Sequence, residues 1–329
     1  MNIVPSQRSP LPVRRLGGSP VFVTELSFGG AAIGNLFTEV TDSDARAAVD
    51  AAWDGGIRTF DTAPHYGLGL SERRLGDALR YRPREEYVIS TKVGRLLRPA
   101  SPPYGRDPEG FAVPADHVRD FDYSADGVRR SLEASLGRLG MDCVDVALIH
   151  DPDDHGEQAF REAYPALEKL RGEGMVRVIG AGMNQAAMLT RFVTDTDIDV
   201  VLVAGRYTLL DRSAADALLP AALERGVSVI AGGVFNSGLL AAPAPGATYD
   251  YQAAPDELIG RARRLENISA RYGVPLRAVA ARFPLTHRAV ASVLVGARSA
   301  AEITDAIRLR AIDIPAELWV TLGIDGENS

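Results

Sequence analysis

The sequence predicts an α/β fold, a (β/α)8 TIM barrel, and three observations support this prediction. Eight short apolar runs recur along the 329 residues, and a stretch with helical spacing of apolar residues follows each run. The runs are continuously apolar, which is typical of parallel strands buried on both faces. No linker divides the chain into halves, although the length alone would also fit two domains of about 150 residues each. We therefore expect one barrel domain over residues 1–329.

The expected strands and helices alternate along the chain. The strands cover residues 26–28, 58–60, 87–90, 144–149, 176–179, 199–203, 227–230 and 292–295. The helices cover residues 42–53, 71–79, 124–139, 160–171, 185–192, 213–225, 256–272 and 300–310. Asp42 and Ser71 are suited to cap the starts of two helices, and Gly55, Gly140 and Gly226 to end three. An open dinucleotide-binding sheet is the alternative, but the glycines that follow the first strand lack the Gly-x-Gly-x-x-Gly spacing.

Two further features fit a barrel. Residues 13–16 and 21–23 flank a turn, and we expect this β-hairpin to plug the bottom of the barrel. Two long loops, 94–123 and 232–255, follow the third and seventh strands and are rich in glycine and proline. Loops that follow barrel strands lie at the C-terminal mouth, where barrel enzymes carry their chemistry. The functional site is therefore expected at this mouth.

Composition narrows the classes of partner. The chain has 36 Lys and Arg against 43 Asp and Glu, a formal net charge of −7, and no basic block. Nucleic acids and anionic membranes select cationic surfaces, so neither is expected as a partner. The single cysteine, Cys143, excludes an intrachain disulfide and a site with several thiolate ligands. The first residues lack a signal peptide and no run reaches the roughly 18 apolar residues of a membrane span, so we expect a cytoplasmic protein with a small-molecule substrate. The oligomeric state stays open.

Four polar residues stand where neighbouring strands are expected to end. Asp61 ends the second strand, Lys92 follows the third and His150 closes the fourth, while Tyr66 lies shortly after Asp61. Adjacent strands of a barrel bring such residues to one place. A buried lysine needs a carboxylate partner, and a phenol with an ordinary pKa of about 10 needs a nearby cation to exchange protons near neutrality. The four residues therefore indicate proton transfer at a carbonyl or hydroxyl group, with His150 orienting the substrate oxygen.

Each of these residues also has a structural alternative. Asp61 and Lys92 can form an ion pair that only stabilises the strand ends, and a lone His150 is more often hydrogen-bonded than catalytic. No nucleophile with an adjacent base stands at a strand end, which argues against covalent hydrolysis.

The segment from His150 to His155 contains residue types that bind metals, which keeps a barrel metal-dependent hydrolase open as an alternative. The chain lacks a His-x-His motif after the first strand, however, and we favour a structural role at a helix N-terminus for Asp151, Asp153 and Asp154. No metal site is therefore predicted. A non-catalytic nucleotide-binding module is the third alternative.

The candidate residues lie in motifs that resemble the aldo-keto reductase superfamily over nearly the whole chain. The matching stretches are residues 56–67 (GIRTFDTAPHYG), 71–76, 90–93, 131–140, 144–150 and 296–299. The resemblance implies that Tyr66 donates and accepts the proton, that Lys92 and Asp61 tune it, and that His150 orients the substrate.

The resemblance also implies a nicotinamide cofactor, bound across the barrel mouth without a Rossmann motif. In that family the loops after strands seven and eight hold the phosphates, as barrels commonly bind phosphate. The corresponding cofactor-binding residues are Asn184, for the nicotinamide carboxamide, and Gly232, Phe235, Ser237, Gly238, Gly296, Ala297, Arg298, Ser299 and Glu302.

Departures from the family pattern predict NAD as the preferred cofactor, with NADP possible. Members that prefer NADP usually place Lys-Ser and a later Arg in the last loop, where this chain has Gly296-Ala297 and Glu302. A carboxylate there repels a third phosphate, whereas Arg298 still offers a cation for it.

Two further departures concern the nicotinamide ring. The glutamine that many members carry after strand six corresponds to Ala204, and their ring-stacking tyrosine corresponds to Gly232. Phe235 is the candidate to replace that tyrosine.

Segments 150–154, 179–184 and 203–211 resemble the branch of the family that contains L-fucose or D-threo-aldose 1-dehydrogenases and an NAD-dependent pyridoxal 4-dehydrogenase. The implied reaction is the oxidation of a sugar's anomeric hydroxyl to a lactone. Pyridoxal oxidation and NADPH-dependent reduction of aldehydes or ketones are the alternatives. Four arginines of the loop 94–123 are expected to be solvated, namely Arg95, Arg98, Arg106 and Arg119.

Overall fold

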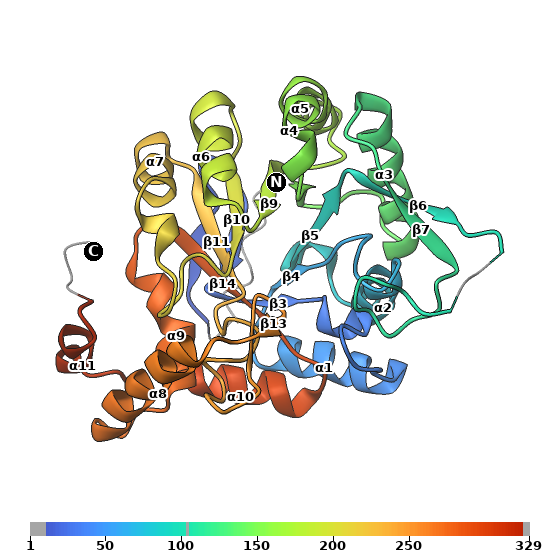
Figure 1. Ribbon diagram of the computed structural model, residues 1–329. Helices are drawn as coiled ribbons and strands as arrows, with labels where there is room; N and C mark the ends of the chain where they lie inside the picture. Colours follow the sequence, from blue (N-terminus) through green and yellow to red (C-terminus); the bar gives the residue numbers. More distant parts are fainter. Residues whose placement is uncertain (1–10, 103–104, 325–329) are drawn as a thin grey trace.

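Eight parallel strands close into a barrel, as the sequence predicts (Figure 1). The computed structural model describes residues 11–102 and 105–324. Hydrogen bonds join the strands in the order β10-β11-β14-β3-β4-β5-β8-β9, and β9 pairs with β10 to close the ring. The barrel strands are β3 (Leu26–Gly29), β4 (Thr59–Asp61), β5 (Val88–Val93), β8 (Val146–His150), β9 (Val178–Met183), β10 (Val200–Ala204), β11 (Ser228–Gly232) and β14 (Val290–Gly296).

Every barrel strand ends further along the chain than its apolar run predicts. In β9, Gly180 interrupts the apolar run, so the predicted strand stops too early. Glycine is required at this position because the neighbouring strand approaches closely. A Cβ atom on Gly180 would lie 1.8 Å from the carbonyl oxygen of Val200. In β5 the apolar run stops before Lys92, although the strand continues to Val93. A charged residue is rarely buried, so its presence indicated the end of the strand.

Helices surround the barrel (Figure 1), and successive helices contact one another along much of the ring. The surrounding helices are α1 (Asp42–Asp54), α2 (Leu70–Leu79), α3 (Ala125–Leu139), α5 (Tyr164–Gly172), α6 (Ala186–Asp195), α7 (Leu218–Arg225), α9 (Leu276–Arg282) and α10 (Ala300–Arg310). Two predicted helices differ at their starts: Ala159–Ala163 form a π-helical turn before α5, and Ser213–Ala215 form a 3-10 turn before α7.

Helix caps are partly as predicted. Gly140 and Gly226 end α3 and α7 in the left-handed conformation. The cap predicted at Asp42 is wrong, because the hydroxyl of the preceding Thr41 accepts the backbone hydrogen bond of the first turn. The cap predicted at Ser71 is also wrong, since Ser71 lies inside α2 and its hydroxyl donates to a carbonyl that follows β3.

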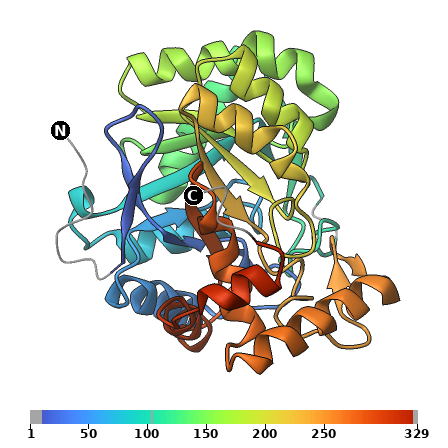
Figure 2. The same cartoon turned by 90° about the vertical axis from the view of Figure 1, so that its left-hand side faces the viewer.

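The N-terminal hairpin closes the bottom of the barrel, as predicted (Figure 2). Strand β1 (Val13–Arg15) pairs antiparallel with β2 (Phe22–Thr24). Leu16 and Val23 are buried and belong to one apolar cluster with Val88, at the N-terminal end of β5. The opposite end of the barrel is therefore the one left to bind ligands.

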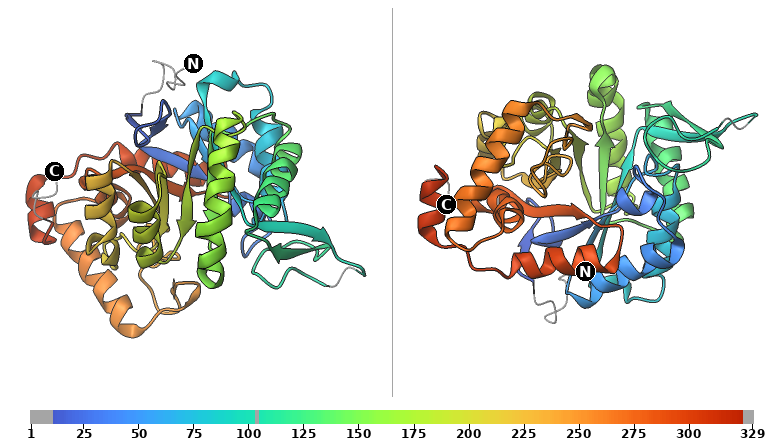
Figure 3. Two further views of the ribbon diagram at one scale, coloured as in Figure 1. Left: turned by 90° about the horizontal axis from the view of Figure 1, so that it is seen from above. Right: turned by 60° about the horizontal axis from the view of Figure 1, so that its bottom comes forward.

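The long loops at the mouth contain elements that the sequence does not predict. Strands β6 (Arg95–Pro99) and β7 (His117–Phe121) form a hairpin that projects from the barrel (Figure 3). After β11, β12 (Thr248–Tyr249) pairs with β13 (Gln252–Ala253). The remaining helices are α4 (Gly156–Gln158), α8 (Asp256–Arg271) and α11 (Ala316–Thr321). In the part of the chain that the structure describes, no helix is long and apolar enough to cross a membrane.

Candidate active site

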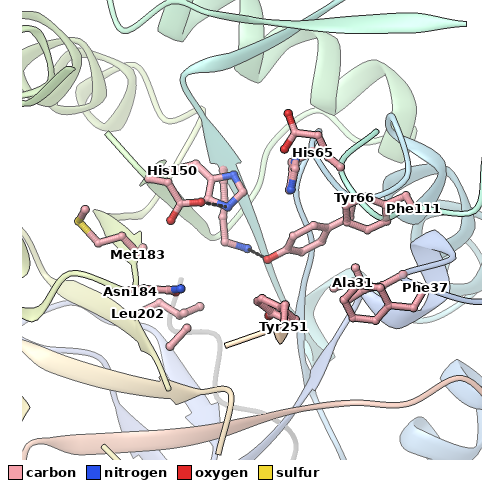
Figure 4. Close-up of a pocket in the computed structure, with 16 residues that line it drawn as sticks. Ala31, Phe37, His65, Tyr66, Phe111, His150, Met183, Asn184, Leu202 and Tyr251 are labelled. Carbon is pink, nitrogen blue, oxygen red and sulfur yellow. Dashed lines mark hydrogen bonds and ion pairs between the residues drawn. The ribbon is translucent and has the colours of Figure 1, made fainter. Parts of the chain in front are cut away.

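The C-terminal mouth of the barrel brings together the four residues predicted for catalysis. Asp61 ends β4, Lys92 is the penultimate residue of β5, and His150 ends β8. These strands are neighbours in the barrel, with β4 beside β5 and β5 beside β8. Tyr66 lies in the turn between β4 and α2, and its hydroxyl points back to the Lys92 side chain (Figure 4).

The Lys92 ammonium group is buried and uses all three of its hydrogen-bond donors. Nζ donates to Oδ2 of Asp61 (2.7 Å), to the carbonyl oxygen of Thr62 (3.0 Å) and to the hydroxyl of Tyr66 (3.0 Å). Ser90 donates to the other carboxylate oxygen of Asp61 (2.9 Å). Burial alone would lower the pKa of Lys92, but Asp61 and Tyr66 raise it above its ordinary value. The lysine therefore stays charged.

The Tyr66 hydroxyl accepts the hydrogen bond of Lys92, which leaves its own proton to donate to a ligand. Burial raises the pKa of Tyr66, and the Lys92 ammonium lowers it only in part, so this pKa stays above its ordinary value. The predicted contact with a cation is confirmed. Lys92 lowers the pKa of Tyr66, as expected, but burial has the larger effect.

The Tyr66 ring borders a cavity of about 310 Å³. Figure 4 shows Tyr66, His150, Asn184 and Tyr251 arranged around it. The lining residues are Ala31, Leu36, Phe37, His65, Tyr66, Lys92, Glu109, Phe111, His150, Asp151, Gly182, Met183, Asn184, Leu202, Ala204 and Tyr251. The lining combines polar side chains, such as those of Lys92 and His150, with apolar ones, such as those of Phe111 and Met183.

His150 is buried, and its ring lies edge to face with Tyr66, with centroids 6.0 Å apart. Its Nε2 lies 3.4 Å from Oδ2 of Asp151, and Nδ1 has no partner among the described residues. Burial first, and then the cations Arg95 and Lys92, lowers the pKa of His150 well below its ordinary value. The carboxylate beside Nε2 favours the neutral tautomer that carries its proton there. The ring thus presents an N–H donor suited to a substrate oxygen.

Sequence reasoning missed most of the residues that line the cavity, and His65, Phe37 and Tyr251 show why. His65 precedes Tyr66 in the chain, and its ring contacts those of Tyr66 and His150. Its position in the sequence, directly before the candidate phenol, could have indicated that it lies in the site. Phe37 and Tyr251 come from loops far apart in the sequence, and only the fold brings their ring centroids to 5.6 Å.

Several charged residues differ from expectation. Asp153 and Asp154 lie in the first turn of a short helix, as expected, whereas Asp151 lies before it, lines the cavity and pairs with Arg95 (2.5 Å). Arg95 and Arg119, expected to be solvated, are buried in ion pairs. Arg98 and Arg106 are exposed, as predicted. The loop 94–123 therefore supplies buried cations beside the site.

A second cavity, of about 690 Å³, adjoins the first and reaches the start of α10. Ala31, Leu36, Phe37 and Tyr251 border both cavities. The second cavity is lined by six of the residues predicted to bind a cofactor, namely Phe235, Ser237, Gly238, Gly296, Arg298 and Glu302. Asn184 lines the first cavity, and its carboxamide has no hydrogen bond within the described part of the chain. The two adjoining cavities together form a groove, with Asn184 at the end near Tyr66 and the other six residues toward α10.

Three other predicted cofactor residues line neither cavity. Gly232 ends β11, Ala297 is buried, and Ser299 caps α10 with its hydroxyl. Phe235 borders only the second cavity, whereas Tyr251 borders both. Of these two aromatic side chains, only Tyr251 therefore reaches the cavity that Tyr66 borders.

Arg298 and Glu302 pair at the far end of the groove. Oε1 of Glu302 accepts a hydrogen bond from Nη2 of Arg298 (2.7 Å), and Oε2 accepts one from the Arg298 backbone N–H (2.8 Å). Burial would raise the pKa of Glu302, but these bonds lower it below its ordinary value. The carboxylate is therefore ionised and holds the guanidinium group.

The acidic segment after β8 does not assemble a ligand cluster. Among residues 11–102 and 105–324, no group of three or more His, Cys, Asp or Glu side chains is arranged to hold a metal ion. His155 stacks on Phe121 of the projecting hairpin, with ring centroids 5.7 Å apart.

Comparison with known proteins agrees with this geometry. The model of the aldo/keto reductase family matches residues 25–322. A D-threo-aldose 1-dehydrogenase of a Pseudomonas species is 47% identical, covering 91% of this chain and 93% of the relative. A pyridoxal 4-dehydrogenase of Microbacterium luteolum is 41% identical, covering 95% of this chain and 97% of the relative. The holo form of an aldo-keto reductase from Bacillus halodurans superposes with a TM-score of 0.74 at 28% identity, covering 95% of each chain. The resemblance noted in the motifs is thus confirmed, and the chain belongs to the aldo/keto reductase family of oxidoreductases, which act on small molecules with a nicotinamide cofactor.

Proposed function

We propose that the protein is an NAD-dependent aldose 1-dehydrogenase that oxidises the anomeric hydroxyl of a sugar to a lactone. The hydrogen-bonded chain from Asp61 through Lys92 to Tyr66 carries this proposal, because it places a proton-transfer group in a cavity that joins the long groove. The 47% identity to a D-threo-aldose 1-dehydrogenase supports the substrate class.

Tyr66 acts as the general base in this reaction. Lys92 donates a hydrogen bond to the Tyr66 oxygen and stabilises the phenolate that removes the proton of the C1 hydroxyl. The Nε2–H of His150 holds the same substrate oxygen while it becomes the carbonyl oxygen of the lactone. The chemistry that nicotinamide supplies when bound is acceptance of the hydride from C1. The sugar thereby loses a hydride and a proton, that is, two protons and two electrons in all, and the proton leaves through Tyr66.

The groove residues give the cofactor its proposed partners. Asn184 would bind the carboxamide of the nicotinamide, and the loop containing Ser237 and Gly238 would approach the diphosphate. Glu302 favours NAD, since its carboxylate repels a 2′-phosphate, accepts hydrogen bonds from ribose hydroxyls and keeps Arg298 occupied.

Oxidation of pyridoxal is the second candidate function. The aromatic rings of Phe37, Phe111 and Tyr251 border the first cavity and can pack on a flat heteroaromatic substrate. The relative named pyridoxal 4-dehydrogenase, 41% identical, supports this alternative.

A substrate panel separates the two candidates. The purified protein is mixed with NAD and, one at a time, with L-fucose, D-arabinose, D-ribose and pyridoxal, and NADH is followed by its absorbance. We expect NADH to form fastest with the aldoses, together with the corresponding lactone. NADH formation with pyridoxal alone would assign the second function. Activity confined to NADPH and simple aldehydes would contradict both.

A further inference from the structure

Asp151 borders the first cavity, yet the proton-transfer chain does not use it. Its side chain is 33% exposed, and its Oδ2 lies 3.4 Å from Nε2 of His150. An apolar ligand binds poorly beside a carboxylate, because it removes water from the carboxylate without supplying a hydrogen-bond donor, and this desolvation is costly. The position of Asp151 therefore indicates a ligand that carries a donor.

Contacts on several sides hold Asp151 in place. Its backbone N–H donates to the carbonyl of Gly182 (3.0 Å), and its carbonyl accepts from the hydroxyl of Tyr123 (2.9 Å). Oδ2 accepts from Nη2 of Arg95 (2.5 Å), whose side chain is itself buried. The carboxylate is thus fixed at the cavity wall.

The backbone does not explain why an aspartate stands here. Asp151 has φ of 41°, in the left-handed region that residues other than glycine rarely adopt. Glycine would meet this requirement without strain, whereas aspartate tolerates it through its short polar side chain. We therefore look for the role of Asp151 in its carboxylate and not in its backbone conformation.

One carboxylate oxygen of Asp151 is left for a ligand. Arg95 and His150 both approach Oδ2, and Oδ1 has no hydrogen-bond partner among the described residues. An ionised oxygen in this position accepts strongly from a hydroxyl group, because charge-assisted hydrogen bonds are shorter and stronger than neutral ones.

We propose that Asp151 selects the substrate by accepting a hydrogen bond from the C2 hydroxyl of the aldose, next to the reacting carbon. This inference rests on the proposed function, in which His150 binds the oxygen on C1. Asp151 and His150 line the same cavity with Oδ2 and Nε2 3.4 Å apart, a spacing that suits contacts with oxygens on neighbouring carbons. A substrate without that neighbouring hydroxyl leaves the carboxylate without its donor.

Three sugars test this contact. D-arabinose and D-ribose differ only in configuration at C2, and 2-deoxy-D-ribose has no hydroxyl there. For the wild-type protein we expect kcat/KM for D-arabinose to exceed that for 2-deoxy-D-ribose by about 10- to 100-fold, as for one hydrogen bond to a charged group. D-ribose should also be a poorer substrate than D-arabinose.

Two variants remove the proposed contact. Asp151→Asn keeps the left-handed backbone but loses the charge, and Asp151→Gly suits that backbone and removes the carboxylate. Both should lower kcat/KM for D-arabinose about tenfold or more beyond any loss for 2-deoxy-D-ribose, because the carboxylate beside His150 is lost for both sugars and the C2 contact for D-arabinose alone. Asp153→Asn, an exposed carboxylate nearby, is the matched control and should keep the wild-type preference. NADH binding, followed by fluorescence, reports whether each variant retains its fold.

The outcomes separate this inference from the proposed function. A preference for D-arabinose that collapses in both Asp151 variants supports the contact. Equal losses on D-arabinose and 2-deoxy-D-ribose, or a preference that survives Asp151→Gly, overturn it, since Asp151 would then act on the chemistry or the fold. A wild-type protein that oxidises no aldose with NAD overturns the proposed function, and the inference with it.

Discussion

Tyr66 has one hydrogen-bonding neighbour in the proton-transfer chain, Lys92, so replacing it with phenylalanine removes the exchanging proton and little else. We expect Tyr66→Phe to lower kcat for sugar oxidation by about 10² to 10⁴, the usual contribution of a general base. NADH affinity should stay near the wild-type value, because the phenyl ring keeps its packing against Phe111 and His150. Steady-state kinetics and a fluorescence titration measure the two quantities. A variant with the wild-type kcat would show that another group is the base.

The pH dependence of oxidation follows from the same residue. Burial raises the pKa of Tyr66, and only its deprotonated form accepts the substrate proton. We therefore expect kcat/KM for oxidation to rise with pH through the alkaline range, by up to about tenfold per pH unit while the phenol is mostly protonated. A pH profile of the wild-type protein, with Tyr66→Phe as the control, measures this slope. The same slope in both proteins would assign it to a different group.

Residues at strand ends could be predicted from the sequence, and residues placed by long-range contacts could not. Asp61, Lys92 and His150 follow apolar runs, and a barrel brings the ends of neighbouring strands together. Asp151 follows His150 directly, but the acidic residues after it resemble the start of a helix. Its hydrogen bond from the buried Arg95 has no local sequence signal, so its place at the cavity could not be predicted. Tyr251 reaches the cavity only through the small hairpin after β11.

At the scale of the elements, the start of α10 controls the choice between cofactors. Glu302→Gln removes the negative charge and weakens the hold on Arg298, which then faces the groove as a free cation. We expect the ratio of kcat/KM for NADP to that for NAD to rise by about tenfold, as for one partly exposed charge interaction with a phosphate.

Cofactor kinetics with both dinucleotides measure this ratio. Glu317→Gln, an exposed carboxylate on α11, is the matched control and should leave the ratio unchanged. If Glu302→Gln also leaves it unchanged, the preference is set elsewhere in the groove, and the proposed role of this pair is wrong.

Elements built from local signals were predicted well. All eight barrel strands and the N-terminal hairpin are present, because runs of buried β-branched residues and turn residues are local features. The hairpin of β6 and β7 was missed, since its strands are partly exposed and rich in charge, and its position depends on Arg95 reaching Asp151. The π-helical turn before α5 likewise has no local signal.

At the scale of the whole molecule, the distribution of charge matters more than its sum. The net charge is −7, yet Lys92, Arg95 and Arg119 are buried beside the cavity. Their carboxylate partners offset these cations. His65 and His150 stay neutral because burial first, and then the neighbouring cations, lowers the pKa of each ring. The net negative charge of the chain is thus not repeated at the cavity, where the buried cations and carboxylates balance one another.

The largely buried side chain of His65 gives the fold a defined sensitivity to acid. Burial first, and then the neighbouring cations, lowers the pKa of His65 from 6.5 to about 2. Between these values the unfolded chain binds a proton that the native protein does not, so the free energy of unfolding falls as pH falls below about 6.5. Between pH 7 and pH 5 we expect His65 alone to account for a loss of about 1 to 2 kcal/mol, the lower figure applying if water in the cavity screens the ring.

His65→Asn and His65→Phe do not titrate, and the second keeps the aromatic packing, so both should lose less stability than the wild type over this interval. Urea unfolding of the three proteins at both pH values measures the difference, and an equal loss in all three would show that His65 does not resist protonation in the native state.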